Sequence, residues 1–266
     1  MADERGRPPR PGPAGSRTSA VQRVLDAHVA SSAERLGRPL RVLDLGGGTG
    51  GTAVPLAVAG HDLTVVDPSP DALFSLRRRA AEHGVEDRVR ALQGDADTVR
   101  DLVGETGGAG DAGASGAVFD LVCLHGALEV VDDPDAAVGA VAALLTPGGT
   151  FSLVVAQRLH AVLTNALAGR LDRARAVLTR PDGRWGEDDP VPRRFDSSAV
   201  VDLVRAQGLT PVHVQGVRMF ADLVPSALLD SEADRTALVA LEEAAAGSEH
   251  PLGALGSALH VLATRD

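Results

Sequence analysis

The sequence has no lysine, isoleucine or tyrosine, only one cysteine, and 2% aromatic residues. A lone Cys123 excludes an internal disulfide and a cysteine-rich metal site, which fits a reducing cytoplasm. No apolar run approaches the roughly 18 residues that cross a bilayer, and the N-terminus lacks the apolar segment of a secretory signal. We therefore expect a cytoplasmic protein with no membrane contact and no metal.

Positive charge is also scarce, because the net charge is −10 and all 26 basic residues are arginines. This balance argues against a broad basic face, which is the main source of affinity for nucleic acids. The distribution is uneven: residues 42–155 carry 17 acidic and six basic side chains, whereas residues 156–219 carry seven acidic side chains and ten arginines. Residues 156–219 can therefore still form a local positive surface.

The chain length of 266 residues, 44% of them hydrophobic, suffices for one large domain. Residues 1–18 are mostly Pro, Arg and Gly and are predicted to form a disordered N-terminal tail. The domain then spans residues 19–266, and its first helix is predicted from Val21 to Leu36. Helical embellishments are expected at 157–195 and 223–246, and a mobile glycine-rich loop at 104–117.

Short apolar runs rich in β-branched residues alternate with helical patterns, which predicts an α/β fold with a sheet covered by helices on both faces. Pro70–His83 and Pro134–Leu145 are the clearest helices. Seven strands are predicted, and they span residues 41–45, 62–67, 88–94, 119–124, 150–155, 209–217 and 257–264.

A glycine-rich run, VLDLGGGTGG, follows the first strand. Its residues are Asp44, Gly46, Gly47, Gly48, Gly50 and Gly51. Glycines permit a tight turn and a close approach of the backbone to a ligand. The spacing fits two motifs: G-x-G-x-x-G of dinucleotide sites, through Gly46, Gly48 and Gly51, and D-x-G-x-G-x-G, through Asp44, Gly46, Gly48 and Gly50.

Other residues favour the second motif. A carboxylate at Asp44 would repel a diphosphate but can anchor a cationic amino group. Asp67 follows the first glycine by about 20 residues and suits a ribose diol in either family. Asp95 and Asp97 end the third strand, and a Pro147-Gly148-Gly149 turn precedes the fifth. The set resembles the class I S-adenosylmethionine (SAM) methyltransferases and implies their seven-stranded Rossmann-like sheet, with Asp95 and Asp97 at the adenine edge. A dinucleotide-binding oxidoreductase or regulatory domain is the remote alternative.

Longer segments resemble a narrower family. They are HGALEVVDDP with LTPGG, NALAGRLDRA (165–174), QGVRMFADLV (215–224) and the C-terminal part from ALVALEEAA to LGSALHVLATRD. These resemble the bacterial tRNA 5-carboxymethoxyuridine methyltransferases, which esterify the carboxylate of a modified wobble uridine. The resemblance implies SAM contacts at Arg23, Gly46, Gly47, Asp67, Ala96, Asp97 and His125. From the residues alone, His125 can equally be a packed histidine, and Cys123 reads as a small buried apolar group.

The acceptor remains open between tRNA and a small molecule. A carboxylate is already ionised at neutral pH and needs no general base, so no catalytic side chain is expected. Arg158 and Arg218 are candidates for orienting such a carboxylate, or they are solvated surface arginines. A positive patch near the SAM site would favour tRNA, and it would comprise Arg170, Arg173, Arg175, Arg193 and Arg194. A closed apolar pocket under 157–195 would favour a small-molecule O- or N-methyltransferase.

Overall fold

A computed structural model describes residues 14–104, 118–246 and 251–266. The predicted tail lies outside the described residues up to residue 13, and the predicted loop at 104–117 lies outside them from residue 105. The first helix, α1 (Ala14–Leu36), begins before the predicted Val21 and includes the last residues assigned to the tail.

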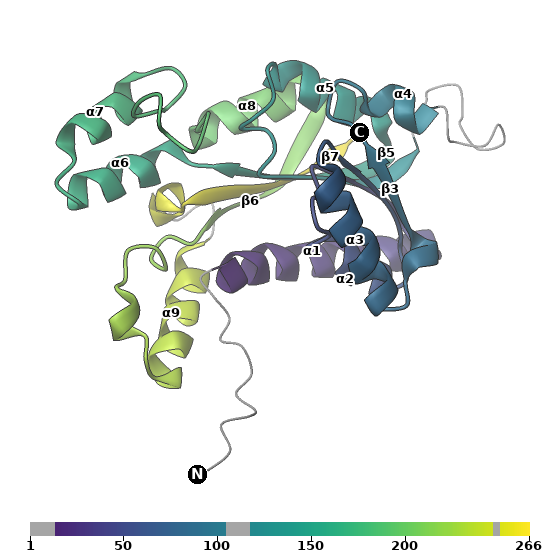
Figure 1. Cartoon of the computed structure of the whole chain (residues 1–266), viewed down its shortest axis with the longest axis horizontal. Helices are drawn as coiled ribbons and strands as arrows, with labels where there is room; N and C mark the ends of the chain where they lie inside the picture. Colours follow the sequence, from purple (N-terminus) through teal and green to yellow (C-terminus); the bar gives the residue numbers. More distant parts are fainter. Residues whose placement is uncertain (1–13, 105–117, 247–250) are drawn as a thin grey trace, which may run out of the picture.

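Within the described residues, seven strands form one sheet in the order β3-β2-β1-β4-β5-β7-β6 (Figure 1). Their bounds are β1 (Arg41–Leu45), β2 (Asp62–Asp67), β3 (Val89–Gln93), β4 (Phe119–His125), β5 (Leu145–Ala156), β6 (Leu209–Val217) and β7 (Ala258–Arg265). Strands β1 to β5 pair in parallel, and β7 pairs antiparallel with both β5 and β6. The carboxyl ends of β1 to β6 therefore share one edge of the sheet, with the start of β7.

The Pro147-Gly148-Gly149 turn was expected to precede the fifth strand, and the structure corrects this. Strand β5 already begins at Leu145, and its pairing with β4 shifts register between Phe119 and Leu121. Gly148 has φ +71°, and a Cβ on Gly149 would lie 2.7 Å from the Thr146 carbonyl oxygen. The turn is thus an irregularity inside the strand, of the kind that glycine permits.

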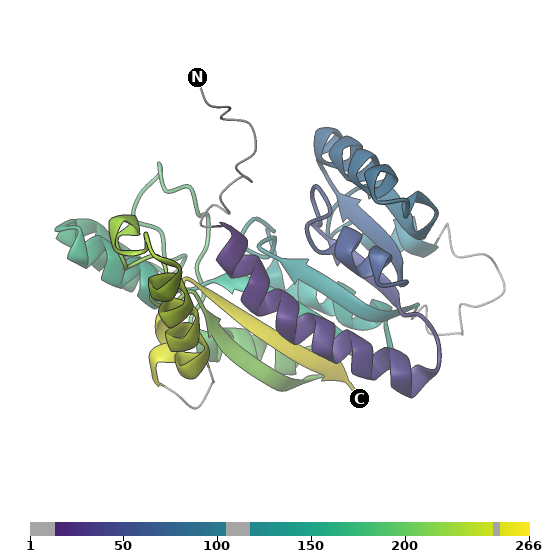
Figure 2. The same ribbon diagram turned by 90° about the horizontal axis from the view of Figure 1, so that it is seen from below.

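Two helix layers bury the sheet. One face carries α1, α2 (Ala53–Val58) and α3 (Pro70–Glu82), and the other carries α4 (Val99–Gly104), α5 (Pro134–Leu144) and α8 (Ser197–Ala206). Helices α3 and α5 begin with a proline, and each is capped by a side chain, Ser69 or Asp133, that accepts a backbone hydrogen bond. Figure 2 shows α1 lying along the sheet, where Val21 clusters with Val154 of β5.

Helices also lie in the segments 157–195 and 223–246, and both segments leave from the carboxyl edge of the sheet. Between β5 and β6 lie α6 (Arg158–Leu167) and α7 (Leu171–Thr179), followed by an irregular segment that reaches Phe195. Between β6 and β7 lie a short turn, η2 (Ser226–Leu228), α9 (Glu232–Ala245) and η3 (Pro251–Leu255). These additions project beyond the sheet (Figure 1), so they flank whatever binds at that edge.

Candidate functional site

The turn after β1 depends on its glycines. Gly46, Gly48 and Gly50 have φ values of +73°, +54° and +80°, a region that side chains disfavour. Gly47 has no positive φ, but a Cβ there would lie 2.5 Å from Oδ2 of Asp44. The glycines thus let the backbone pass directly over the carboxyl group at the end of β1.

Asp44 is the most unusual group at this edge. Its side chain is 2% exposed, and Oδ2 is buried without a hydrogen-bond partner among the described residues. Burial, followed by the nearby charge of Asp67, raises the pKa of Asp44 to about 7. A buried carboxyl without a partner is unfavourable when ionised, and a cation beside it would reverse that preference.

Asp67 ends β2 and connects two turns. Its Oδ2 accepts a hydrogen bond from Gly48 N–H at 2.8 Å, and its Oδ1 accepts one from Ser69 N–H at 2.9 Å. Each oxygen keeps a lone pair that a ligand hydroxyl can use. The structure thus brings Asp44, the glycine turn and Asp67 together, and they fit a ligand with an amino group and vicinal hydroxyls, as SAM has.

The third predicted group follows β3. Oδ1 of Asp95 accepts hydrogen bonds from the Thr98 hydroxyl, Thr98 N–H and Asp97 N–H, and these bonds lower the pKa of Asp95. Its side chain therefore shapes the turn that leads into α4. Ala96 is buried and Asp97 is exposed. Contacts of these residues with adenine remain a prediction.

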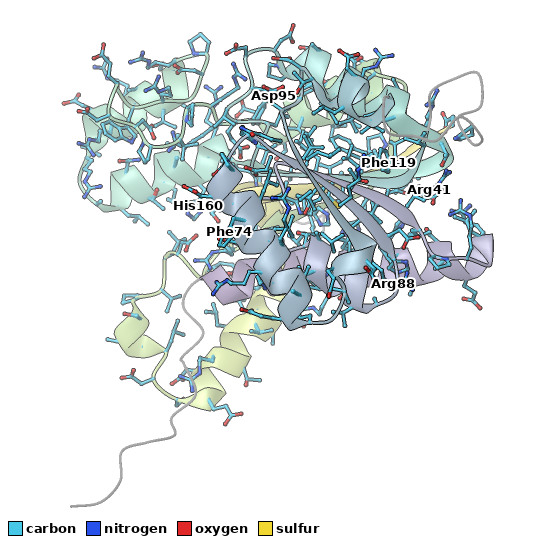
Figure 3. All side chains as sticks on the ribbon, turned by 45° about the vertical axis from the view of Figure 1, so that its right-hand side comes forward. Arg41, Phe74, Arg88, Asp95, Phe119 and His160 are labelled. Atoms are coloured by element: carbon cyan, nitrogen blue, oxygen red, sulfur yellow. The ribbon has the colours of Figure 1, made fainter. Side chains whose placement is uncertain are left out.

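Figure 3 shows the polarity of the sheet through its labelled residues. Asp95 and His160 lie toward the carboxyl edge, whereas Arg41 and Arg88, which stand at the start of β1 and just before β3, lie on the opposite side. His125 ends β4 and so belongs to the carboxyl edge. Its Nε2 lies 2.8 Å from Oγ of Ser152, and burial lowers the pKa of His125 to about 4. The ring is therefore neutral at physiological pH.

Arg23, on α1, forms an ion pair of 2.7 Å with Glu243 of α9, and both side chains are about half exposed. The described contacts of its guanidinium thus link two helices. The SAM contact that the family resemblance implies for Arg23 stays a prediction.

Arg158 follows β5, and the protein itself engages its guanidinium. The two Nη atoms donate to the carbonyl oxygens of Val177, Arg180 and Pro181. Its Nε pairs with Asp196 at 3.1 Å. These contacts hold the end of α7 and the segment after it, which leaves the expected role of Arg158 as a substrate contact without structural support.

Arg218 follows β6 and has φ +59°, the only positive φ of a non-glycine residue in the described ranges. Its buried guanidinium pairs with Asp222, whose carboxylate lies 4.0 Å from Nε2 of His160. Such backbone strain costs energy and concentrates at functional sites. The structure therefore keeps Arg218 as a candidate and places it at the same edge as Asp44 and His125.

The turn that carries Arg218 is anchored by a residue that was not among those predicted for the site. Glu242 of α9 accepts hydrogen bonds of 2.8 Å from N–H groups of Met219, Phe220 and Ala221. His160, two residues after the start of α6, was also not predicted from the sequence as a residue of this edge. Its position just past the end of β5 was a usable signal, since ligands bind beyond the carboxyl ends of strands in such folds.

The described residues form neither a metal-ion site nor a membrane-spanning helix. No group of three or more His, Cys, Asp or Glu side chains there is arranged to hold a metal ion. No helix in the same ranges has the length and apolar character needed to span a membrane.

Comparisons with known proteins identify the family and the fold of this chain. A family profile described as "Methyltransferase domain" matches residues 18–214. The tRNA 5-carboxymethoxyuridine methyltransferase of Escherichia coli K12 is 30% identical over 183 residues, which is 69% of this chain but 64% of that protein. The ubiquinone biosynthesis O-methyltransferase of Xanthomonas axonopodis pv. citri is 33% identical over 129 residues, 48% of each chain.

A solved structure shares the fold. The SAM-dependent methyltransferase from Thermotoga maritima has a TM-score of 0.54 and 19% identity, and the match covers 94% of this chain and 88% of that one. The chain belongs to the methyltransferase-domain family and has the fold of the SAM-dependent enzymes.

Proposed function

We propose that this methyltransferase transfers the methyl group of SAM to a carboxylate oxygen, and that the acceptor is the carboxylate of a modified wobble uridine in tRNA, as in 5-carboxymethoxyuridine. The observation that carries the proposal is Arg218, a buried guanidinium in a strained turn at the carboxyl edge. Guanidinium groups pair with carboxylates in a bidentate geometry. Arg218 is paired with the carboxylate of Asp222, so an acceptor carboxylate would share or replace this partner.

The acid–base chemistry of the edge supports an acceptor that is already ionised. SAM, when bound, supplies an electrophilic methyl group on a sulfonium. A carboxylate with a pKa near 4 attacks without losing a proton, so the enzyme has only to orient it and exclude water. His125 at the end of β4 has its pKa lowered to about 4, which makes it a weak base.

Support for tRNA as the carrier of that carboxylate comes from sequence and surface. The E. coli tRNA methyltransferase is among the relatives. Arg170, Arg173 and Arg175 are exposed on and beside α7, and the Arg173 guanidinium lies 3.9 Å from the Trp185 ring centroid. Exposed arginines next to an aromatic ring suit phosphates and an unstacked base.

A small-molecule O-methyltransferase is the second candidate, because two arginines of the expected patch are not free. Arg194 is buried against Asp189 at 2.7 Å, and Arg193 donates to the carbonyl oxygen of Val131. The positive surface is therefore smaller than the residue count suggests. The similarity to the ubiquinone O-methyltransferase points the same way.

Nucleoside mass spectrometry of tRNA from cells with and without this gene tests the proposal. Loss of one methyl from a wobble uridine in the deletion strain, restored by the wild-type gene and not by an Arg218→Ala variant, would support it. Unchanged tRNA together with SAM binding by the purified protein would move the acceptor to a small molecule.

A further inference from the structure

A hydrogen-bonded chain of four side chains crosses four strands and ends at His125. Nε2 of Gln215 on β6 lies 3.1 Å from Nδ1 of His260 on β7. Nε2 of His260 lies 3.0 Å from Oγ of Ser152 on β5, and that oxygen lies 2.8 Å from Nε2 of His125. Ser152 and His260 are fully buried, and Gln215 is 7% exposed.

Sheet register explains why these residues meet. His125 pairs with Val154, Val154 with His260, and His260 with Gln215, so His125, His260 and Gln215 lie in one row across the sheet, with Val154 between them. Ser152 is two residues before Val154, so it shares the same face. That face is the one covered by α1, where His28 also lies 2.7 Å from the Thr150 hydroxyl.

The donor and acceptor atoms of these four side chains determine the direction of each hydrogen bond in the chain. The Gln215 amide nitrogen can only donate, so Nδ1 of His260 accepts, and the single proton of a neutral imidazole lies on Nε2. That N–H donates to Ser152. The Ser152 hydroxyl is fully buried, and His125 Nε2 is its one remaining side-chain partner among the described residues, so the hydroxyl proton is donated to that nitrogen. The proton of His125 is left on Nδ1, which has no hydrogen-bond partner within the part of the chain that is described.

Both rings stay neutral for the same physical reason. Burial lowers the pKa of His125 to about 4. Burial, reinforced by His125 and His213, lowers that of His260 to about 3. His213 on β6 faces His260 with its ring centroid 6.4 Å away, and the His125 ring is 6.1 Å from His260 on the other side.

We propose that Gln215, His260 and Ser152 are positioning residues that hold His125 as the Nδ1–H tautomer, so that it donates a hydrogen bond at the carboxyl edge and does not act as a general base. This inference rests on the proposed function in taking that edge as the place of methyl transfer. It narrows the acceptor to one that arrives without a proton to lose, such as a carboxylate, and argues against an alcohol, a phenol or an ammonium group.

A variant that reverses the direction of these hydrogen bonds tests the proposal directly. In Gln215→Glu the ionised carboxylate can only accept a hydrogen bond. Donor and acceptor must then exchange in every hydrogen bond of the chain, and His125 is expected to become the Nε2–H tautomer. The readout is the ring nitrogen NMR spectrum of full-length protein labelled with 15N-histidine, at pH 7.5 and without ligand. The His125 signals are identified by their loss in His125→Gln.

In the wild type we expect a protonated Nδ1 and an unprotonated Nε2, and in Gln215→Glu the two assignments should exchange. The control Gln93→Glu adds the same charge on an exposed residue of β3 and should leave His125 unchanged. A wild-type His125 protonated on Nε2 or on both nitrogens would overturn the proposal, as would a folded Gln215→Glu protein in which His125 keeps the wild-type tautomer.

Ser152 provides an independent variant. Ser152→Ala breaks the chain and should give a mixture of His125 tautomers, whereas Ser152→Thr keeps the hydroxyl and should restore Nδ1–H. A purely structural role for Ser152 would leave the tautomer unchanged in both. These spectra need neither SAM nor acceptor. Unchanged tRNA in the deletion strain, together with the Nδ1–H tautomer of His125, would therefore reject the proposed function alone. Loss of the tRNA methyl group, together with an Nε2–H tautomer of His125, would reject the inference alone.

Discussion

The carboxylate of Asp67 accepts a 2.8 Å hydrogen bond from the backbone N–H of Gly48, which joins the end of β2 to the glycine turn after β1. Gly48 stands in the left-handed region, with φ +54°. The conformation of the turn and the position of the carboxylate therefore depend on each other, and a change in one should be measurable in the other.

Asp67→Ala is expected to weaken SAM binding at least tenfold, because a charge-assisted hydrogen bond contributes about 1.5–3 kcal/mol and a tenfold change is about 1.4 kcal/mol. Isothermal titration calorimetry measures this. Asp67→Asn keeps one acceptor oxygen for Gly48 and should lose less. Asp71→Ala, on the exposed first turn of α3, is the control. An unchanged dissociation constant in Asp67→Ala would remove Asp67 from the site.

Asp44 should make stability depend on pH. Its pKa is raised from 3.8 to about 7 in the folded state, so the folded protein retains a proton that the unfolded chain loses. The free energy of unfolding should therefore fall as pH rises from about 4 to about 7, by up to about 4 kcal/mol. Asp44→Asn should remove this slope in denaturant titrations, and it should be more stable than the wild type at pH 8.

Ligand binding should show the opposite preference at Asp44. The cationic amino group of SAM favours the ionised carboxylate, so the affinity of the wild type should fall as pH drops below about 7. In Asp44→Asn the affinity should be weaker and should vary less with pH between 5.5 and 8. A wild-type affinity that is flat over this range would argue that Asp44 does not contact the amino group.

Gly47→Ala and Gly51→Ala form a matched pair. A methyl group on Gly47 would lie 2.5 Å from Oδ2 of Asp44, whereas one on Gly51 meets nothing within 4 Å. Overpacking of this kind costs about 1–3 kcal/mol, so Gly47→Ala should melt lower and bind SAM more weakly. Gly51→Ala should retain both properties, and equal losses in the two variants would contradict the close approach at Gly47.

Arg218→Ala should leave SAM affinity intact and abolish transfer to a carboxylate acceptor. Arg218→Gly should have the same activity defect but be the more stable of the two, because φ +59° favours glycine. Thermal melting and a SAM binding assay separate the two effects. Loss of SAM binding in both variants would reject the role of Arg218 as an acceptor contact.

Glu242→Ala should destabilise the turn that carries Arg218. Its carboxylate accepts N–H groups of Met219, Phe220 and Ala221, and leaving such donors unsatisfied costs about 1–3 kcal/mol. The neighbouring Glu243→Ala removes only the half-exposed pair with Arg23, which should cost less than about 1 kcal/mol. Similar unfolding free energies for the two variants would contradict the anchoring role of Glu242.

Local features of the sequence determined much of the sheet. Strands β1 and β2 have the predicted bounds, 41–45 and 62–67, because each is a short apolar run with an aspartate as its last or second-last residue, followed by a turn. Helices α3 and α5 start at the predicted prolines. The glycine turn with Asp44 is a contiguous motif whose spacing predicts a tight turn at a ligand site, and the aspartates Asp44, Asp67 and Asp95 then favour SAM over a dinucleotide. These features depend on neighbours in the chain, so the order of residues is enough to identify them.

Only the tertiary structure decided which distant polar groups became partners. Arg158 and Arg218 looked alike in the sequence, yet the first is occupied by carbonyl groups of the segment after α7, and the second is held by Asp222 in a strained turn. Ser152 and His260 lie 108 residues apart and meet because β5 and β7 pair in one register. A buried polar atom must find a partner, and strand order and register, rather than local propensity, determine which atoms come within reach.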